Sequence, residues 1–291
     1  MTTMEQTAER FDLHALDGEA LAAYRWPAAG AARGVLLVLH GYAEHALRHG
    51  GLATAAAAAG IDVWAFDQRN HGRSPGAVRG SVDGFEATLG DVAVLRERAL
   101  AASPGLPTFL FGHSMGGAIA LRYALERPAE LAGLVLSAPF LRDAVARPAW
   151  LLRLARPLAR LFPTLPTTKL PPSAISRSGA EVRRYAEDPL IYHGGVRADA
   201  GVTLLEQGAA LLERAPGLAV DTLVVHGSGD AVAALAGSRE LAAASPRVEL
   251  QVLEGGSHEL HHDDPASGVP ERARRAVLDW LAARLVASEH A

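Results

Sequence analysis

The residues of this chain that point most directly to chemistry are Gly112-His113-Ser114-Met115-Gly116. An apolar run, 108–111, precedes them and a helix-like stretch, 118–126, follows, so Ser114 is predicted to lie on a sharp strand-to-helix turn. Glycine suits both flanking positions because strand and helix pack too closely there to leave room for a Cβ atom. A serine displayed in this way is a candidate nucleophile.

A serine hydroxyl is hardly ionised near neutral pH, so it needs a base within hydrogen-bond reach and a third group that holds the base. Asp230 follows the apolar run 222–226 through a glycine turn, and His258 follows the run 248–253 in the same way. If both runs are parallel strands, these side chains lie at one edge of a sheet. We predict Ser114 as nucleophile, His258 as general base and then general acid, and Asp230 as the group that orients His258.

The acid and the base each have alternatives in the sequence. Asp230 in a glycine turn also fits a turn-forming role, and Asp221, Asp263 and Asp264 are competing carboxylates. The cluster His261-His262-Asp263-Asp264 contains metal-ligating residue types, but nothing indicates the surrounding hydrogen-bond partners that a zinc site needs. No metal and no cofactor is predicted.

The oxyanion that forms during acyl transfer must be met by backbone N–H groups that are already in position. The strand-to-helix turn supplies one of them from the residue after the nucleophile, Met115. The second is expected in the loop that follows the apolar run 35–39, where His40-Gly41 precedes Tyr42. The N–H of Tyr42 is the best candidate.

The elements that position these residues follow an alternating pattern. Apolar runs at 35–39, 61–66, 108–111 and 134–137 are separated by helix-like stretches at 47–59, 85–102 and 115–126. The pattern resumes at 222–226 and 248–253 and ends in a helix near 271–286. Such alternation predicts an α/β fold with a mostly parallel sheet, helices on both faces and reactive loops at the carboxyl ends of the strands. Asp17-Gly18 between two strand-like segments, 11–16 and 19–25, predicts an antiparallel hairpin with a two-residue turn.

Between 139 and 198 the alternation stops. Prolines punctuate this apolar stretch, at Pro139, Pro148, Pro157, Pro163, Pro166, Pro171 and Pro172. We predict a core formed by 1–138 and 199–291, into which a cap subdomain, 139–198, is inserted. Leu151, Leu154, Leu158 and Leu161 recur at helical spacing in an amphipathic segment that Pro157 interrupts. Six basic residues face one acid between 142 and 169, so this segment suits either an anionic lipid surface or a cap that packs its leucines over the site.

The whole chain has 291 residues, enough for one large α/β domain with an insertion. A formal net charge of −4 gives no global attraction to nucleic acid, and no nucleic-acid partner is predicted. The absence of cysteine excludes a thiolate nucleophile. Residues 1–10 lack the pattern of a secretory signal, and arginines interrupt the apolar window 148–163, so we expect a cytoplasmic protein without a membrane span.

Taken together, these motifs resemble those of the monoacylglycerol lipases and related lysophospholipase-like enzymes of the α/β-hydrolase fold. The resemblance covers most of the chain. Its landmarks are 40–45, 66–74, 112–117, Ser137-Ala138-Pro139, Asp188-Pro189-Leu190, 227–230 and His258-Glu259-Leu260-His261. It implies Ser114, Asp230 and His258 as the catalytic residues, and Tyr42 and Met115 as the oxyanion donors.

The resemblance also implies a small-molecule substrate, a monoacylglycerol or another single-chain acyl ester that is cleaved through an acyl-enzyme. Arg48, His113 and Tyr185 would line the polar end that holds the glycerol. Each also has a structural interpretation: a helix cap for Arg48, internal packing for His113 and ordinary cap surface for Tyr185. A lysophospholipase, a broad carboxylesterase and a non-catalytic binding protein remain alternatives.

Three positions depart from the family's usual pattern. Asn70 stands where glycine is expected, and asparagine tolerates the left-handed backbone that this loop needs. Tyr42 is larger than the usual small residue, so we expect it to narrow the pocket mouth or to add a hydroxyl contact. The segment 231–234 lacks the polar residue or proline that often follows the acid.

Overall fold

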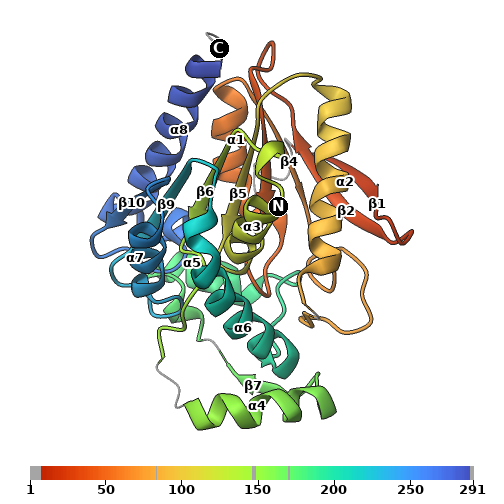
Figure 1. The fold of residues 1–291 in the computed structure, drawn as a ribbon, viewed down its shortest axis with the longest axis vertical. Coiled ribbons are helices and arrows are strands. Elements are labelled where there is room, and N and C mark those ends of the chain that lie inside the picture. The colour runs from red at the N-terminus through yellow and green to blue at the C-terminus, as the bar shows by residue number, and fades with distance from the viewer. Residues whose placement is uncertain (1–7, 83, 146–148, 170, 289–291) are drawn as a thin grey trace.

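The computed structural model describes residues 8–82, 84–145, 149–169 and 171–288 (Figure 1). Residues 1–7, part of the N-terminal segment in which no secretory-signal pattern was found, lie outside this range, as do Arg147 and Pro148 of the predicted cap. The side chains of Leu151, Arg153 and Leu154 also lie outside what is described.

An eight-stranded sheet forms the centre of the molecule, in the order β1-β2-β4-β3-β5-β6-β9-β10. Its strands are β1 (Glu9–His14), β2 (Ala20–Trp26), β3 (Gly34–Leu39), β4 (Ile61–Phe66), β5 (Thr108–His113), β6 (Gly133–Ser137), β9 (Thr222–Gly227) and β10 (Val248–Leu253). From β4 to β10 every neighbouring pair is parallel, while β2 pairs antiparallel with both β1 and β4. The predicted mostly parallel sheet is confirmed. Strands β3 to β6 and β9 are buried along their whole length, which explains their continuous apolar sequences.

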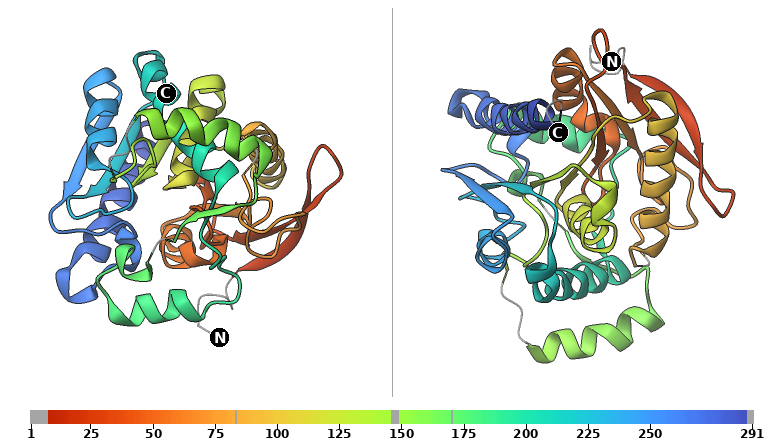
Figure 2. Two further views of the ribbon diagram at one scale, coloured as in Figure 1. Left: turned by 90° about the horizontal axis from the view of Figure 1, so that it is seen from below. Right: turned by 45° about the horizontal axis from the view of Figure 1, so that its top comes forward.

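Helices cover both faces of this sheet (Figures 1 and 2). One face packs against α1 (Gly50–Ala58) and α8 (Val269–Ser288). The other packs against α2 (Glu86–Ala102), α3 (Met115–Glu126), α6 (Ala198–Arg214) and α7 (Leu235–Ala244). Short 3₁₀ helices complete the connections at Ala46–His49, Pro128–Glu130, Pro172–Ala174, Ala215–Gly217, Leu260–His262 and Pro265–Ser267. None of the helices in the described ranges is both long and apolar enough to cross a bilayer.

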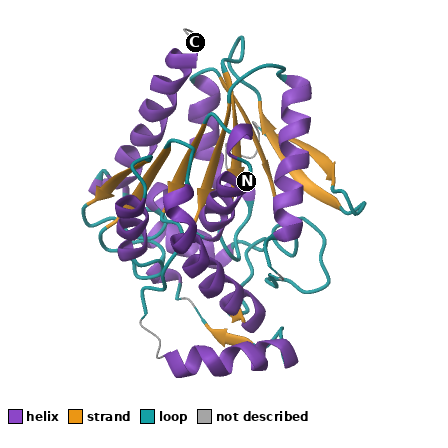
Figure 3. Cartoon of the chain, in the orientation of Figure 1, coloured by secondary structure: helices purple, strands orange, loops and turns teal. Residues whose placement is uncertain are grey.

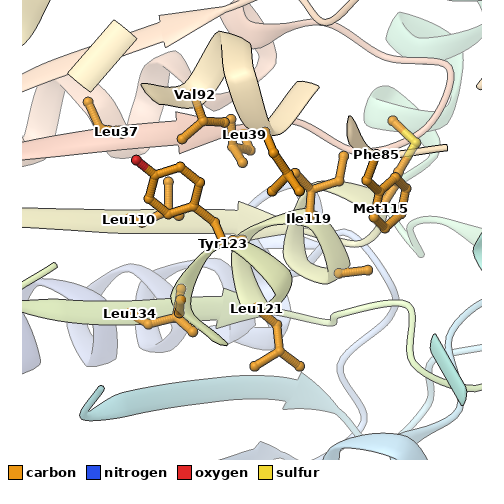
Figure 4. Packing of buried hydrophobic residues seen from close by; sticks show 14 of the residues in the cluster. Leu37, Leu39, Phe85, Val92, Leu110, Met115, Ile119, Leu121, Tyr123 and Leu134 are labelled. Carbon is orange, nitrogen blue, oxygen red and sulfur yellow. The ribbon is translucent and has the colours of Figure 1, made fainter. Parts of the chain in front are cut away.

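Helix α3 is fixed to the sheet by a buried apolar cluster (Figure 4). Ile119 and Tyr123 of α3 pack among side chains from β3, β5 and α2, including Leu37, Leu110 and Val92. All five side chains are almost completely buried. This packing matters for the site because Ser114 directly precedes α3 and moves only if that helix moves.

A cap region lies between β6 and α6. It contains α4 (Ala149–Leu161), β7 (Pro166–Thr168), α5 (Gly179–Glu187) and β8 (Val196–Arg197), and β7 pairs antiparallel with β8. Helix α4 lies at the edge of the molecule, beyond α6 (Figure 3). Pro157 stands inside α4, so the predicted interruption at this residue is wrong. Proline lacks the N–H that would bond the preceding turn, which removes a hydrogen bond without ending this helix.

The N-terminal hairpin is present, but its turn differs from the predicted one. Strands β1 and β2 pair up to His14 and Ala20, and the N–H of Ala15 donates to the carbonyl of Glu19 over 2.8 Å. Three residues therefore form the loop, and its last, Gly18, has φ +87°. A three-residue hairpin loop is commonly a type I turn that ends in a left-handed residue, which explains why glycine stands there rather than earlier.

Candidate active site

Ser114 occupies the turn between β5 and α3 with φ +53° and ψ −114°. A residue with a side chain rarely adopts a positive φ, so its neighbours must hold it there. The Ser114 N–H donates to the carbonyl of Ser137 on β6 over 3.0 Å. The Ser114 carbonyl accepts from the N–H groups of Ala118 and Phe140 at 3.1 and 3.0 Å. The turn is therefore tied to its own helix, to the neighbouring strand and to the start of the cap region.

The two glycines beside Ser114 are required by space, as predicted. A Cβ atom on Gly112 would lie 2.3 Å from the carbonyl oxygen of Gly116. A Cβ atom on Gly116 would lie 2.3 Å from the carbonyl oxygen of Leu39. Both distances are far below van der Waals contact with rigid backbone atoms, so strand, turn and helix approach each other only because these residues lack side chains.

Ser114, His258 and Asp230 form one hydrogen-bonded chain. The Nε2 atom of His258 lies 2.9 Å from Ser114 Oγ, and its Nδ1 atom lies 2.7 Å from Asp230 Oδ2. All three side chains are buried or nearly so. In this arrangement Nδ1–H donates to the carboxylate, which leaves Nε2 free to accept the serine proton.

The Asp230 carboxylate is held in its ionised form. Its Oδ1 atom accepts from the N–H groups of Val232 and Ala233 at 2.8 and 2.9 Å, and its Oδ2 atom lies 3.2 Å from Nε2 of His226. Burial alone would raise the pKa of Asp230, but the adjacent His258 and the hydrogen bonds of both histidines hold this pKa well below its usual value. Two backbone N–H groups from 232–233 supply the support that the sequence 231–234 lacks in its side chains.

His226 was missed by the sequence reasoning. It is the fully buried histidine near the end of β9, and its Nδ1 atom lies 2.8 Å from Ser238 Oγ of α7. Its Nε2 atom also lies 3.1 Å from the carbonyl oxygen of Ala233. A polar residue in an otherwise apolar strand was the one available signal for this contact.

His258 has an electrostatic environment suited to a base. Burial alone would lower its pKa, but the charge and hydrogen bond of Asp230 outweigh burial, so the pKa of His258 lies above the usual imidazole value. A raised pKa makes Nε2 a better proton acceptor once it is deprotonated.

The two predicted oxyanion donors flank the serine. Met115 is the first residue of α3, where backbone N–H groups have no partner in the helix. The loop that carries Tyr42 passes directly against the serine, because a Cβ atom on Gly41 would lie 3.3 Å from Ser114 Cβ. Neither N–H donates to another backbone carbonyl within the part of the chain that the structure describes. Their role stays a prediction that this geometry permits.

A cavity of about 350 Å³ opens beside Ser114, between the core and the cap region. Its walls are mostly apolar and include Phe140, Leu158, Leu165, Ile175, Leu205 and Val232. Glu44, Tyr185 and Glu259 gather around Arg48 at its polar end, with His113 beside Glu44. Further polar residues in the lining are Tyr42, Asp143, Thr167 and Thr168. A largely apolar cavity with a few grouped polar side chains is typical of a small-molecule site.

The three residues predicted at the polar end differ in their placement. His113 and Tyr185 line the cavity, whereas Arg48 does not. His113 Nδ1 donates to the carbonyl of Ser137 over 3.1 Å, and burial lowers the pKa of His113 to about 3, so it is neutral. The guanidinium carbon of Arg48 lies 5.1 Å from the centroid of the Tyr185 ring, so Arg48 supports the wall from behind.

Two buried carboxylates at the polar end were not singled out from the sequence. Arg48 Nε donates to Glu44 over 3.1 Å, and Arg48 Nη2 donates to Glu259. For both acids burial alone would raise the pKa, but nearby cationic and hydrogen-bonding groups lower the pKa of Glu44 well below its usual value and also lower that of Glu259. Both are ionised at neutral pH. No direct signal in the sequence pointed to them: only the burial of Arg48, which the structure shows, requires carboxylate partners.

The alternative acids and the metal cluster are placed elsewhere. Asp221 pairs with the exposed Arg247 at 2.9 Å, and Asp263 pairs with Arg177 and accepts from the Ser257 N–H over 2.8 Å. The Asp264 carboxylate accepts from the Ala266 N–H over 3.0 Å. Within the described ranges no group of three or more His, Cys, Asp or Glu residues could hold a metal ion.

Comparisons with known proteins agree over nearly the whole chain. The model of the family described as serine aminopeptidase, S33, matches residues 30–265. The monoacylglycerol lipase of Mycolicibacterium smegmatis is 36% identical over 259 residues, which cover 87% of this chain and 89% of that protein. The human monoglyceride lipase is 34% identical over 86% of this chain and 83% of its own length. The crystal structure of the Paleococcus ferrophilus monoacylglycerol lipase superposes with a TM-score of 0.80 at 29% identity, over 91% and 99% of the two chains.

Proposed function

Because the chain belongs to the serine aminopeptidase S33 family, and within it to the monoacylglycerol lipase-like α/β-hydrolases, we propose that it hydrolyses single-chain acyl esters of the monoacylglycerol type. Its membership makes it a serine hydrolase. The proposal goes beyond this membership, because it assigns the catalytic residues and the substrate class. The observation that carries it is the hydrogen-bonded chain of Ser114, His258 and Asp230 beside a cavity that is apolar along its length and polar at one end.

The proposed reaction begins when Ser114 Oγ attacks the ester carbonyl while His258 Nε2 takes the serine proton. The N–H groups of Tyr42 and Met115 donate hydrogen bonds to the developing oxyanion. His258 then gives its proton to the alcohol oxygen as the C–O bond breaks, which leaves the acyl group on Ser114. A water molecule repeats the sequence, with His258 again as base and then acid, and releases the carboxylic acid.

Asp230 acts on this cycle through His258. Its hydrogen bond to Nδ1–H selects the tautomer in which Nε2 is the acceptor. Its charge stabilises the imidazolium that forms at each proton transfer. Because Asp230 is itself held by two backbone N–H groups, the imidazole keeps its orientation through both halves of the reaction.

The cavity suggests which end of the substrate lies where. Its apolar walls suit an acyl chain, since burial of each methylene is worth about 0.8 kcal/mol. At the polar end the carboxylates of Glu44 and Glu259 line the cavity, whereas their cationic partner Arg48 does not. Carboxylates accept hydrogen bonds from hydroxyl groups and repel a phosphate, so this end favours an uncharged, hydroxyl-bearing head group such as glycerol over the phosphate of a lysophospholipid.

The direct test is a hydrolysis panel with the wild type and Ser114→Ala. We expect monoacylglycerols to be cleaved faster than lysophospholipids, triacylglycerols and short esters, and Ser114→Ala to abolish cleavage of all of them and labelling by a fluorophosphonate. Circular dichroism controls for folding. Activity that survives Ser114→Ala would overturn the mechanism, and a preference for lysophospholipids would overturn the head-group assignment alone. A folded wild type without activity or labelling would favour a binding protein.

We also propose that residues 139–198 act as an inserted cap through which the enzyme makes peripheral contact with lipid. Leu161 and Phe162, at the end of α4, have exposed fractions of 74% and 57%, and Arg160 beside them is also exposed. Apolar side chains next to a cation suit the surface of an anionic bilayer. The expected cytoplasmic location stays a prediction.

Vesicle sedimentation tests this contact. We expect the double variant Leu161→Asp/Phe162→Asp to lose binding to vesicles of phosphatidylglycerol and phosphatidylcholine, while hydrolysis of a soluble ester is unchanged. If the wild type does not sediment with such vesicles, or the double variant sediments equally, the lipid contact is wrong.

A further inference from the structure

The side chain of Tyr42 joins three separate segments of the chain. Its hydroxyl donates to the carbonyl of Gly80, 2.7 Å away, in the loop between β4 and α2. The same hydroxyl accepts from the N–H of Arg197, over 3.2 Å, at the end of the cap region. The Tyr42 ring also packs edge-on against His71, with 5.5 Å between ring centroids. The residue whose N–H is the predicted oxyanion donor is thus anchored at the far end of its side chain.

The Gly80 acceptor is itself held by Asn70. Asn70 has φ +64°, its carbonyl accepts from the Gly80 N–H over 3.0 Å, and its side-chain amide donates to the carbonyl of Ser81 over 3.1 Å. Glycine would supply the left-handed backbone at this position but not the side-chain hydrogen bond. Tyr42 and Asn70 are two of the positions where the chain departs from its family's usual residues, and they meet at Gly80.

The loop that carries Tyr42 needs such support. Ala43 has φ +69°, a conformation that persists in a non-glycine residue only where its surroundings impose it. The cap region supplies two further contacts: the Tyr192 N–H donates to the Ala43 carbonyl over 2.8 Å, and His45 Nε2 lies 2.8 Å from Asp188 Oδ2. Cap residues 188–197 therefore hold residues 42–45 at three points.

We propose that Tyr42 is a positioning residue for the oxyanion hole, and that its phenol ties the donor loop to Gly80 and to the cap so that core and cap together form the hole. This inference rests on the proposed function, because it assumes that the Tyr42 N–H binds the oxyanion. An oxyanion donor acts only within about 2.7–3.1 Å of the oxygen, so a small rotation of this peptide weakens the transition state more than the bound ester.

Tyr42→Phe tests the hydroxyl while it keeps the ring against His71. On a soluble p-nitrophenyl ester we expect kcat to fall roughly tenfold with KM nearly unchanged, less than the loss of a whole oxyanion donor. A trifluoromethyl ketone forms a tetrahedral adduct with the serine, and its inhibition constant should rise by the same factor. The matched control is Tyr123→Phe, which also removes a hydroxyl hydrogen bond and keeps the ring: the Tyr123 hydroxyl donates to Glu130, beyond the C-terminal end of α3, whereas Ser114 precedes the first residue of that helix.

Asn70→Gly provides a second and independent variant. We expect a smaller loss of kcat in the same direction, and no further loss when it is combined with Tyr42→Phe, since the lost amide hydrogen bond to Ser81 holds the loop whose Gly80 carbonyl accepts from the Tyr42 hydroxyl. A Tyr42→Phe enzyme with unchanged kcat and unchanged inhibition constant would overturn the proposal, as would a rise in KM alone. Ser114→Ala separates the two hypotheses. If Ser114→Ala retains activity, the proposed function is wrong. If Ser114→Ala is inactive and Tyr42→Phe has no effect, only the positioning role of Tyr42 is wrong.

Discussion

At the scale of single residues, the site depends on how each polar group is held by the next. His258 is oriented by Asp230, and Asp230 is held by the N–H groups of residues 232–233 and by His226. Arg48 is held between Glu44 and Glu259 and in turn supports Tyr185. The buried charges are paired, which is the condition under which charges remain stable inside a protein.

Asp230→Asn should separate orientation from charge. We expect kcat/KM to fall by roughly 10³ to 10⁴, the loss typical of a serine hydrolase whose histidine loses its carboxylate. The acid limb of the pH profile should also move. His258 must be neutral to act as base. Without the Asp230 carboxylate its pKa falls, because burial lowers this pKa and only the charges of Glu259 and Glu44 still raise it, so the limb shifts to lower pH. The measurement is kcat/KM on a soluble ester from pH 5 to 9.

The matched control for this change is Asp221→Asn, since Asp221 is an alternative acid in the sequence and pairs with Arg247 at the surface. Asp221→Asn should retain wild-type activity and the wild-type pH profile. If Asp221→Asn lost activity and Asp230→Asn did not, the acid assignment would be wrong.

The sequence indicated Ser114, Asp230 and His258 because each follows a recognisable strand and because they occur along the chain in the order serine, aspartate, histidine. Their catalytic roles stay predictions, although the structure brings the three within hydrogen-bond distance. The placement of Arg48 could not be predicted, because its position in the sequence does not show that it pairs with Glu259, 211 residues further on, and so lies behind the cavity wall. The contact of His226 with Asp230 could not be predicted either, because one polar residue in an apolar strand is too weak a signal.

At the scale of secondary-structure elements, the strands and helices that could be predicted were those with a clear pattern of apolar residues. The six parallel strands were all predicted. Five of them are buried along their length and leave nearly continuous apolar runs, whereas the edge strand β10 is only partly buried and contains Glu249 and Gln251. Helices α6 and α7 were not predicted. The buried positions of α7 are Gly237, Ser238 and Leu241, so only one of them carries an apolar signal at helical spacing.

Gly116→Ala tests how tightly α3 is packed behind Ser114. The added Cβ atom would overlap the carbonyl oxygen of Leu39, so we expect a loss of at least roughly 2 kcal/mol in the free energy of unfolding, with loss of activity. Urea denaturation measures the first and ester hydrolysis the second. Gly90→Ala in α2 is the control, because a Cβ atom there meets only Leu16, 3.9 Å away.

For Gly90→Ala we expect the opposite sign, a gain of roughly 0.5–1 kcal/mol, because alanine loses less backbone entropy than glycine in a helix. Equal effects of the two substitutions would show that general helix propensity, and not the close approach of α3 to β3, decides the outcome.

At the scale of the whole molecule, the cap region and the core share the loops that carry the reaction. Besides its contacts with residues 42–45, the cap holds the His258 loop: the Glu259 N–H donates to the Ile175 carbonyl over 2.8 Å, and Ser176 Oγ donates to the His262 carbonyl over 2.7 Å. Helix α4 makes its main contacts with α6 instead. The second half of the cap therefore belongs to the frame of the site, while α4 forms an outer wall.

The buried histidines also make the stability of the whole molecule depend on pH. Burial lowers the pKa of His40 to about 4 and that of His71 and His113 to about 3, and it lowers the pKa of His261 well below the usual value. Protonation of His40 would break the hydrogen bond that its Nε2 accepts from the Gln68 N–H over 2.8 Å. These four side chains therefore stay neutral in the folded protein at pH values where the unfolded chain binds protons.

Each of these histidines contributes stability that is fully present above about pH 6.5, the imidazole value in the unfolded chain, and that is lost as pH falls toward the folded pKa. His258 has a raised pKa, so its opposite effect lies mainly above about pH 6.5 and does not offset these losses at lower pH. We expect the free energy of unfolding to fall by several kcal/mol between pH 7 and pH 5, as measured by urea denaturation at fixed ionic strength.

His71→Gln removes one of the four buried histidines, so it should reduce the slope of stability against pH by about one proton. Glutamine can still donate to the Arg69 carbonyl that His71 Nδ1 contacts at 2.8 Å, so this hydrogen bond can be kept. A stability that does not vary between pH 7 and pH 5 would mean that the buried histidines take up protons in the folded state.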